Sequence, residues 1–295
     1  MGSAVWYLMT GPAHLARFAV SLWSLRKHWA GRVLVYTTRE PTRGIIKRWV
    51  ETDQRANVTH HHADIQTNVR RSNRQFVTKV WLAPQLGSDT YLYLDADTLV
   101  LGPVDPLLDA ASEHGVCVTQ WNDWTTASKI IGKRLDGWLK YADQIEWLTT
   151  MRERLRTDPM PSVNGGVFAF KINSPMFAEW HRLCVIGQGQ FICDEVALHY
   201  VYPLYPHAIG LDGVWNWAPD LMDRPDGARI AHFHGDKHFR PASAPMWTET
   251  FREVWDANFC GIREWAPAND DRLRDHWHEV VTDGAQPKAL EDVMT

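Results

Sequence analysis

The segment YLYLDADTLV, residues 91–100, places two aspartates directly after four apolar or aromatic residues. A short apolar run of this kind is typical of a buried strand. Ligands of open α/β sheets bind outside the carboxyl ends of the strands, so a strand that ends in acidic residues delivers them to the functional edge. Residues i and i+2 of an extended segment point to the same side, so we expect the carboxylates of Asp95 and Asp97 to lie together.

Two adjacent carboxylates repel each other and resist ionisation unless a cation lies between them. Oxygen ligands suit a hard divalent ion, Mg²⁺ or Mn²⁺ more than Zn²⁺. Asp95 and Asp97 are therefore interpreted as ligands of a divalent metal ion. The same residues also fit a polar strand exit, in which each aspartate caps a turn or pairs with an arginine.

Strands and helices alternate around this segment. Residues 4–10 and 31–38 are short apolar strands, and the apolar residues of 15–29 recur at spacings of three and four, which predicts a helix with one buried stripe. Further elements are assigned in the same way: a helix at 73–83 and strands at 57–63, 114–121, 164–172 and 228–234. This order predicts an α/β fold of the Rossmann-like kind, with a mostly parallel sheet and helices on both faces.

Composition limits the function classes. At 295 residues, 45% of them hydrophobic, the chain is long enough to bury a sizeable core. A formal net charge of -4 provides no basic field for non-specific nucleic-acid binding. The apolar runs are shorter than a membrane span and the first residues lack signal-peptide features, so we expect a cytoplasmic protein with no membrane span. The four cysteines form no C-x-x-C pair and are expected to be reduced thiols.

Four segments carry a resemblance to a known family. They are TKVWLAPQLGSDTYLYLDADTLVLGPVDPLL (78–108), SVNGGVFAFK (162–171), CDEVALHYV (193–201) and IAHFHGDKHF (230–239). In order and spacing they resemble the nucleotide-sugar glycosyltransferases of the GT-A fold, closest to glycosyltransferase family 8, the group of glycogenin and the bacterial lipopolysaccharide galactosyltransferases. The resemblance implies a GT-A catalytic domain over residues 1–240, with a helical insertion at 122–160, and a helical or loop extension over 241–295.

The resemblance also implies an activity. Enzymes of this family move a sugar from a nucleoside diphosphate sugar to an acceptor, and we expect a UDP-sugar, retention of configuration, and Mn²⁺ or Mg²⁺ held by Asp95, Asp97 and His232. The residues implied to bind the donor are Thr10, Lys79, Asp95, Asn164, Gly165, Gly235, Lys237 and His238, and those implied to act at the reacting carbon are Asp194 and Glu195. The sequence does not specify whether the acceptor is a glycan, a lipid, a protein or a nucleic acid.

The chain departs from the family pattern at two places. The position three beyond Gly235 is His238, and Lys237 stands one residue early, so which of the two side chains reaches the diphosphate is open. Glu195 stands where the family has glutamine. A carboxylate at this place could act as a nucleophile in a retaining reaction or as a general base in an inverting one.

Two other functions fit parts of the sequence. In the haloacid-dehalogenase phosphatases an Asp-x-Asp-x-Thr motif ends a strand and its first aspartate, which would be Asp95, attacks phosphate. Here Thr98 follows Asp97 directly, and Leu99 holds the place that the threonine should occupy. A non-catalytic carbohydrate-binding relative would be expected to lack a metal ligand, whereas all three ligands are present.

Overall fold

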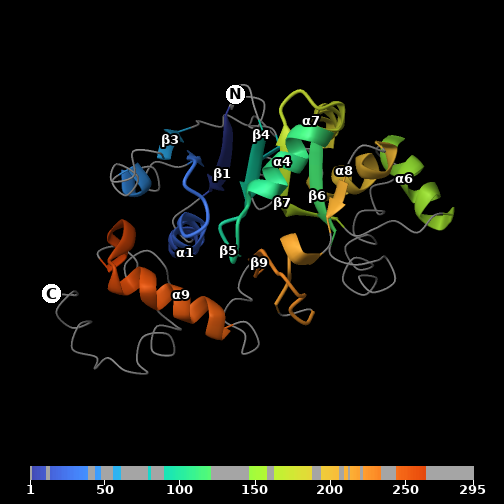
Figure 1. Ribbon diagram of the computed structural model, residues 1–295. Coiled ribbons are helices and arrows are strands. Elements are labelled where there is room, and N and C mark those ends of the chain that lie inside the picture. The colour runs from blue at the N-terminus through green and yellow to red at the C-terminus, as the bar shows by residue number, and fades with distance from the viewer. Residues whose placement is uncertain are drawn as a thin grey trace.

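The computed structural model describes residues 2–10, 14–38, 44–47, 56–60, 79–80, 90–120, 146–157, 163–187, 194–205, 209–211, 213–219, 222–233 and 244–263. Its main feature is a seven-stranded sheet with the order β3-β2-β1-β4-β7-β6-β8 (Figure 1). The strands are β1 (Ser3–Met9), β2 (Arg32–Thr37), β3 (Ala56–His60), β4 (Thr90–Leu94), β6 (Val116–Gln120), β7 (Val163–Lys171) and β8 (Ile209–Leu211). Strand β7 is antiparallel to both neighbours and the other neighbouring pairs are parallel, which confirms the mostly parallel sheet.

Helices cover both faces of this sheet. They are α1 (Leu15–Arg26), α4 (Asp105–His114), α6 (Glu146–Thr157), α7 (Pro175–Gly187), α8 (Asp194–Val201) and α9 (Ala244–Asp256), with 3₁₀ turns at Tyr202–Leu204, Gly213–Trp215 and Phe259–Gly261. Val5, Tyr7 and Met9 of β1 pack in a buried cluster with apolar residues of α1, α4 and α9. The alternate residues of the same strand, including Trp6, pack in a second cluster with α6, α7 and α8. Both faces of β1 are thus buried, as its uninterrupted apolar sequence predicts.

A second, two-stranded sheet joins β5 (Thr98–Val100) to β9 (Ile230–His232). The pairing is antiparallel and places Thr98 opposite His232. Figure 1 shows these strands just beyond the end of β4. A segment from late in the chain is thereby fixed beside the aspartates that follow β4.

Helix α9, in the expected C-terminal extension, packs against α1. Trp247 and Phe251 of α9 are buried in the cluster that α1 contributes to. Glu253 accepts a 2.7 Å hydrogen bond from Nε1 of Trp23 and pairs with Lys27. The domain boundary at residue 240 stays a prediction.

The expected insertion at 122–160 contains helix α6, and its residues 122–145 lie outside the described part of the chain. Of the helix expected at 73–83, the structure describes residues 79–80, which are helical. Among the helices that the structure describes, none has the length and apolar character needed to cross a membrane.

Candidate metal centre and donor site

The aspartates lie in a turn between β4 and β5. We expected Asp95 and Asp97 to belong to one extended strand, but β4 ends at Leu94 and the chain turns at 95–97. The hydroxyl and the amide of Thr98 both donate to the carbonyl oxygen of Asp95, at 2.9 and 3.3 Å, which closes the turn. The prediction that both aspartates lie in an extended strand was therefore wrong. Their carboxylates converge because the turn folds them toward one point.

Neighbouring elements hold this turn in place. The amide of Asp95 donates to the carbonyl of Gly166 at 2.8 Å, and the amide of Phe233 donates to the carbonyl of Asp97 at 3.0 Å. Because the Thr98 hydroxyl donates to Asp95, its oxygen accepts the 2.8 Å hydrogen bond from the buried hydroxyl of Ser21 in α1. Strand β7, the end of β9 and helix α1 thus fix the turn from three directions.

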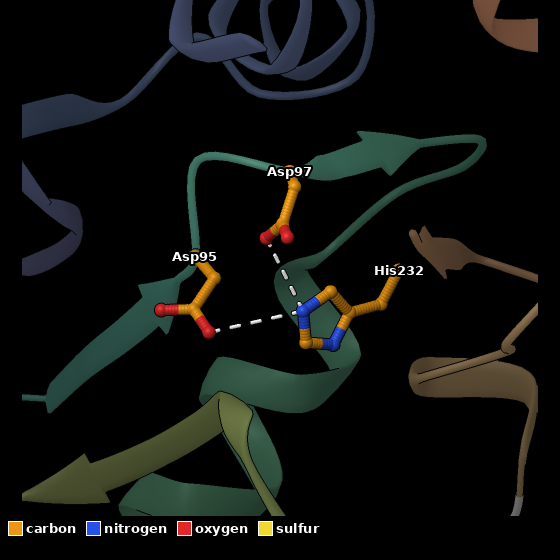
Figure 2. A group of neighbouring side chains, drawn as sticks. All are labelled: Asp95, Asp97 and His232. Carbon is orange, nitrogen blue, oxygen red and sulfur yellow. Dashed lines mark ion pairs between the residues drawn. The ribbon is translucent and has the colours of Figure 1, made fainter. Parts of the chain in front are cut away.

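Three side chains from this region form a group that could hold a metal ion. One ligand atom each from Asp95, Asp97 and His232 lies within 4.8 Å of the others. Nε2 of His232 lies 3.3 Å from Oδ1 of Asp97 and 3.7 Å from Oδ2 of Asp95, as Figure 2 shows. The His232 side chain is 3% exposed, whereas those of Asp95 and Asp97 are 32% and 15% exposed. The group therefore has a buried imidazole side and an acidic side open to solvent.

The donor set of this group fits a divalent ion. Two carboxylate oxygens and one imidazole nitrogen face a common point, and oxygen-rich sets of this kind suit Mn²⁺ and Mg²⁺. A cation between the carboxylates would also remove their mutual repulsion.

Tyr93 orients the first of the aspartates. Its hydroxyl donates a 2.5 Å hydrogen bond to Oδ1 of Asp95, which leaves Oδ2 on the side of His232. Burial, with the Asp95 carboxylate acting in the same direction, raises the pKa of Tyr93 well above its ordinary value, so the phenol stays a donor. From the sequence we treated Tyr93 only as a strand residue. Its place two residues before Asp95 was the available signal.

Gly166 is a second residue of the site that the sequence analysis did not identify. A Cβ on this residue would lie 2.1 Å from Cε1 of His232 and 2.7 Å from Oδ2 of Asp95. Only glycine lets β7 pass this close to the candidate metal ligands. The predicted donor residue Gly165 has more room, since its Cβ would lie 3.1 Å from Oδ2 of Asp194 and 3.2 Å from Nζ of Lys79.

Lys79 and Asp194 form a buried ion pair beside the candidate metal ligands. Nζ of Lys79 lies 3.0 Å from Oδ2 of Asp194 and 3.9 Å from Oδ1 of Asp95. Burial alone would lower the pKa of Lys79, but the nearby carboxylates, Asp194 foremost, outweigh burial and raise this pKa above its ordinary value. Burial raises the pKa of Asp194 to about 6, although the Lys79 ammonium acts in the opposite direction.

Asn164 connects Glu195 to the other site residues. Its Nδ2 donates a 2.6 Å hydrogen bond to Oε1 of Glu195, and its Oδ1 accepts from the amide of Gly166 at 2.8 Å. Glu195 follows Asp194 at the start of α8. The acidic start of this helix therefore lies next to the Asn-Gly-Gly segment of β7, as the four resembling segments imply.

The structure thus brings together most of the predicted site residues: Lys79, Asp95, Asp97, Asn164, Gly165, Asp194, Glu195 and His232. Thr10 directly follows β1, the neighbour of β4, and so lies at the same edge of the sheet. The other three predicted donor residues, Gly235, Lys237 and His238, lie outside the described part of the chain.

Comparison with known proteins bears on the fold. No protein-family model matches the sequence, and neither does any curated protein. Solved structures do match. The bifunctional glycosyltransferase WbbM, in its apo form, has a TM-score of 0.59 at 14% identity over 86% of this chain and 51% of its own. The galactosyltransferase LgtC, in complex with donor and acceptor sugar analogues, has a TM-score of 0.57 at 13% identity over 86% of this chain and 95% of its own.

Mouse xyloside xylosyltransferase 1, also in its apo form, has a TM-score of 0.55 at 12% identity over 80% of this chain and 99% of its own. This chain has the GT-A fold. The fold that the four segments implied is therefore confirmed. The chain spans about half the length of WbbM and nearly the whole of the other two. At these identities the likeness concerns the fold, and the activity has to be argued from the site.

Proposed function

We propose that this protein is a metal-dependent glycosyltransferase that moves a sugar from a nucleoside diphosphate sugar, a UDP-sugar, to an acceptor with retention of configuration. One observation carries the proposal. Asp95, Asp97 and His232 converge at the carboxyl end of β4, on the edge where α/β sheets bind their ligands. The GT-A fold, which solved glycosyltransferases share with this chain, supports the same assignment.

Asp95, Asp97 and His232 would hold Mn²⁺ or Mg²⁺. The bound ion would neutralise negative charge on the leaving diphosphate. Tyr93 and Gly166 prepare this site, the first by orienting Asp95 and the second by leaving room for His232. The positive charge of Lys79 lies beside Asp95 and would add a charge-assisted contact to the donor.

Asp194 and Glu195 would have separate tasks in the reaction. The Asp194 carboxylate is buried against Lys79 and holds that ammonium in position. Glu195 is less buried, and one of its oxygens is fixed by Asn164. Glu195 would therefore face the donor sugar and stabilise the positive charge that develops as the glycosidic bond breaks.

The remaining donor contacts follow the same resemblance. We assign the nucleotide base to the neighbourhood of Thr10, at the end of β1. Gly235 would let the backbone approach the diphosphate. Lys237 or His238 would add a charge-assisted contact to its oxygens.

The alternatives fit the observations less well. The phosphatase motif needs a threonine two residues after its second aspartate, and Leu99 holds that place here. A non-catalytic relative would be expected to have lost a ligand, whereas the three candidate ligands converge.

A screen of nucleotide sugars tests the proposal. The protein is incubated with Mn²⁺ and UDP-, GDP- or TDP-sugars, and release of the nucleoside diphosphate is measured, with an Asp97→Asn variant as the matched control. We expect release with a UDP-sugar that requires Asp97. Hydrolysis of a phosphomonoester without turnover of any nucleotide sugar would instead establish the phosphatase alternative.

A further inference from the structure

Asn216 lies behind the candidate metal centre, at a position that the sequence did not single out. The residue is fully buried and directly follows the 3₁₀ turn Gly213–Trp215. Two backbone bonds attach this segment to β9: the amide of Trp217 donates to Ile230 at 2.9 Å, and the amide of His232 donates to Trp217 at 2.7 Å. The side chain of Asn216 is thereby held beside the imidazole of His232.

All the polar atoms of the Asn216 side chain have partners. Its Nδ2 donates to Oγ1 of Thr119 at 2.8 Å and to Oδ1 of Asn164 at 3.1 Å. Its Oδ1 lies 2.9 Å from Nδ1 of His232. The amide therefore links strands β6 and β7 to the buried side of the metal centre.

The other hydrogen bonds of Thr119 and Asn164 determine which way the Asn216 amide points. The Thr119 hydroxyl donates its proton to the carbonyl of Val167 at 3.0 Å, so its oxygen can only accept from Asn216. Oδ1 of Asn164 already accepts from the amide of Gly166, so it too is an acceptor. Both partners require the NH₂ group of Asn216, and the amide oxygen must then face His232.

An amide oxygen facing Nδ1 requires a proton on that nitrogen. The imidazole then donates through Nδ1, and Nε2 is the ring atom that faces Asp95 and Asp97. A histidine that binds a metal ion needs a lone pair on the ligating nitrogen, and the hydrogen bond made by the other nitrogen selects it.

We propose that Asn216 is a positioning residue that keeps the proton of His232 on Nδ1 and so reserves Nε2 for a divalent cation. The metal-binding part of this inference rests on the proposed function. Through Asn164, the same amide also connects the imidazole to Glu195, so one buried network sets the metal ligand and the acidic residue at the reacting carbon.

The test compares two substitutions in the same buried network. Asn216→Leu removes the contact to His232 at nearly constant volume, and Thr119→Val removes a partner of the amide that does not touch the imidazole. Long-range proton–nitrogen NMR of protein labelled with ¹⁵N-histidine, free of metal and at mildly alkaline pH, reports which ring nitrogen carries the proton. A His232→Gln variant assigns the signal.

We expect the proton on Nδ1 in the wild type and in Thr119→Val, in which Oδ1 of Asn164 still requires the NH₂ group of Asn216 and so keeps the amide orientation. In Asn216→Leu we expect a measurable loss of Nδ1 protonation. Mn²⁺ affinity, measured by calorimetry, should fall about 10–100-fold in Asn216→Leu and stay near the wild-type value in Thr119→Val. If the His232 imidazole of the wild type carries its proton on Nε2 alone, the proposal is overturned, even if neither variant folds. The proposal is also overturned if Asn216→Leu keeps both the Nδ1-proton signal and the Mn²⁺ affinity of the wild type. Wild-type protein that shows the Nδ1 proton and binds Mn²⁺ but turns over no nucleotide sugar would contradict the proposed function and leave this inference intact.

Discussion

The Tyr93 hydroxyl donates a 2.5 Å hydrogen bond to Oδ1 of Asp95, so a buried residue of β4 orients a carboxylate of the turn that follows the strand. The other oxygen of Asp95 lies 3.7 Å from Nε2 of His232. A partner of this kind, behind a metal ligand, limits the rotation of the carboxylate before an ion arrives.

Tyr93→Phe should therefore weaken metal binding. The substitution removes one oxygen and leaves the ring in place, so the fold should be kept while Asp95 becomes free to rotate. We expect Mn²⁺ affinity to fall toward the lower end of the about 10–100-fold range typical of such partners, measured by titration calorimetry. Tyr91→Phe, the same change two residues earlier in β4, is the matched control. Equal affinities in the two variants would show that the hydrogen bond to Asp95 has no role in binding the ion.

Asp97→Asn should abolish the stabilisation of the folded protein by divalent ions. An ion that binds only the folded protein raises stability by about 2.7 kcal/mol at a hundred times its dissociation constant, so Mn²⁺ should raise the melting temperature of the wild type. Asp97→Asn should lose this increase. Without the ion the variant should be at least as stable as the wild type, because one of two neighbouring carboxylates has lost its charge. An Mn²⁺-dependent increase that persists in the variant would place the ion elsewhere.

Gly166→Ala should disturb the candidate metal centre more than Gly165→Ala. The new methyl group at 166 would lie 2.1 Å from the ring of His232, which is held from behind by Asn216, so the ligand has no room to give way. At 165 the nearest atoms are at 3.1 Å and belong to the ends of Asp194 and Lys79. Overpacking of a tight interior costs about 1–3 kcal/mol. Urea unfolding and Mn²⁺ titration of both variants check the order, and equal losses would contradict it.

Lys79 and Asp194 should show strong coupling in a double-mutant cycle. Removing one partner of a buried ion pair leaves an uncompensated charge and costs about 3–5 kcal/mol. We expect Lys79→Met, which leaves the buried Asp194 carboxylate without its partner, to reduce the free energy of unfolding by a large amount, and Asp194→Asn added to that variant to recover much of the loss. Additive losses would mean that the 3.0 Å contact contributes little to the folded state.

The sequence was sufficient for most of the central sheet, and it singled out Asp95, Asp97 and His232, which converge in the structure. Strands β1, β4 and β7 are apolar runs that can only be buried, and the aspartates after β4 mark its functional end. The turn conformation of Asp95 and Asp97 was missed because it depends on the Thr98 hydroxyl and on Ser21 in a distant helix. Strands β5 and β8 have three residues each, too few for any periodic signal.

Asn216 could not be predicted at all. It stands in the segment GVWNWAPD, residues 213–220, which has neither a motif nor a regular apolar pattern. Its role depends on Thr119, Asn164 and His232, which come from three strands far apart in the sequence. Only the pairing of β5 with β9 and of β6 with β7 brings those residues to one place.

The pH dependence of stability gives a further check on the buried carboxyl of Asp194. Its pKa is raised by burial from 3.8 to about 6, so between these values the folded protein binds a proton that the unfolded chain has lost. The contribution of this carboxyl to stability is therefore greatest at the acidic end of that window and falls as the pH rises through it. The asparagine of Asp194→Asn does not titrate.

The free energy of unfolding of the wild type relative to Asp194→Asn should thus decrease from pH 3.8 to about 6 and then stay level, as measured by urea unfolding at a series of pH values. A difference between wild type and Asp194→Asn that rises with pH would mean that the Lys79 ammonium outweighs burial and keeps Asp194 ionised throughout.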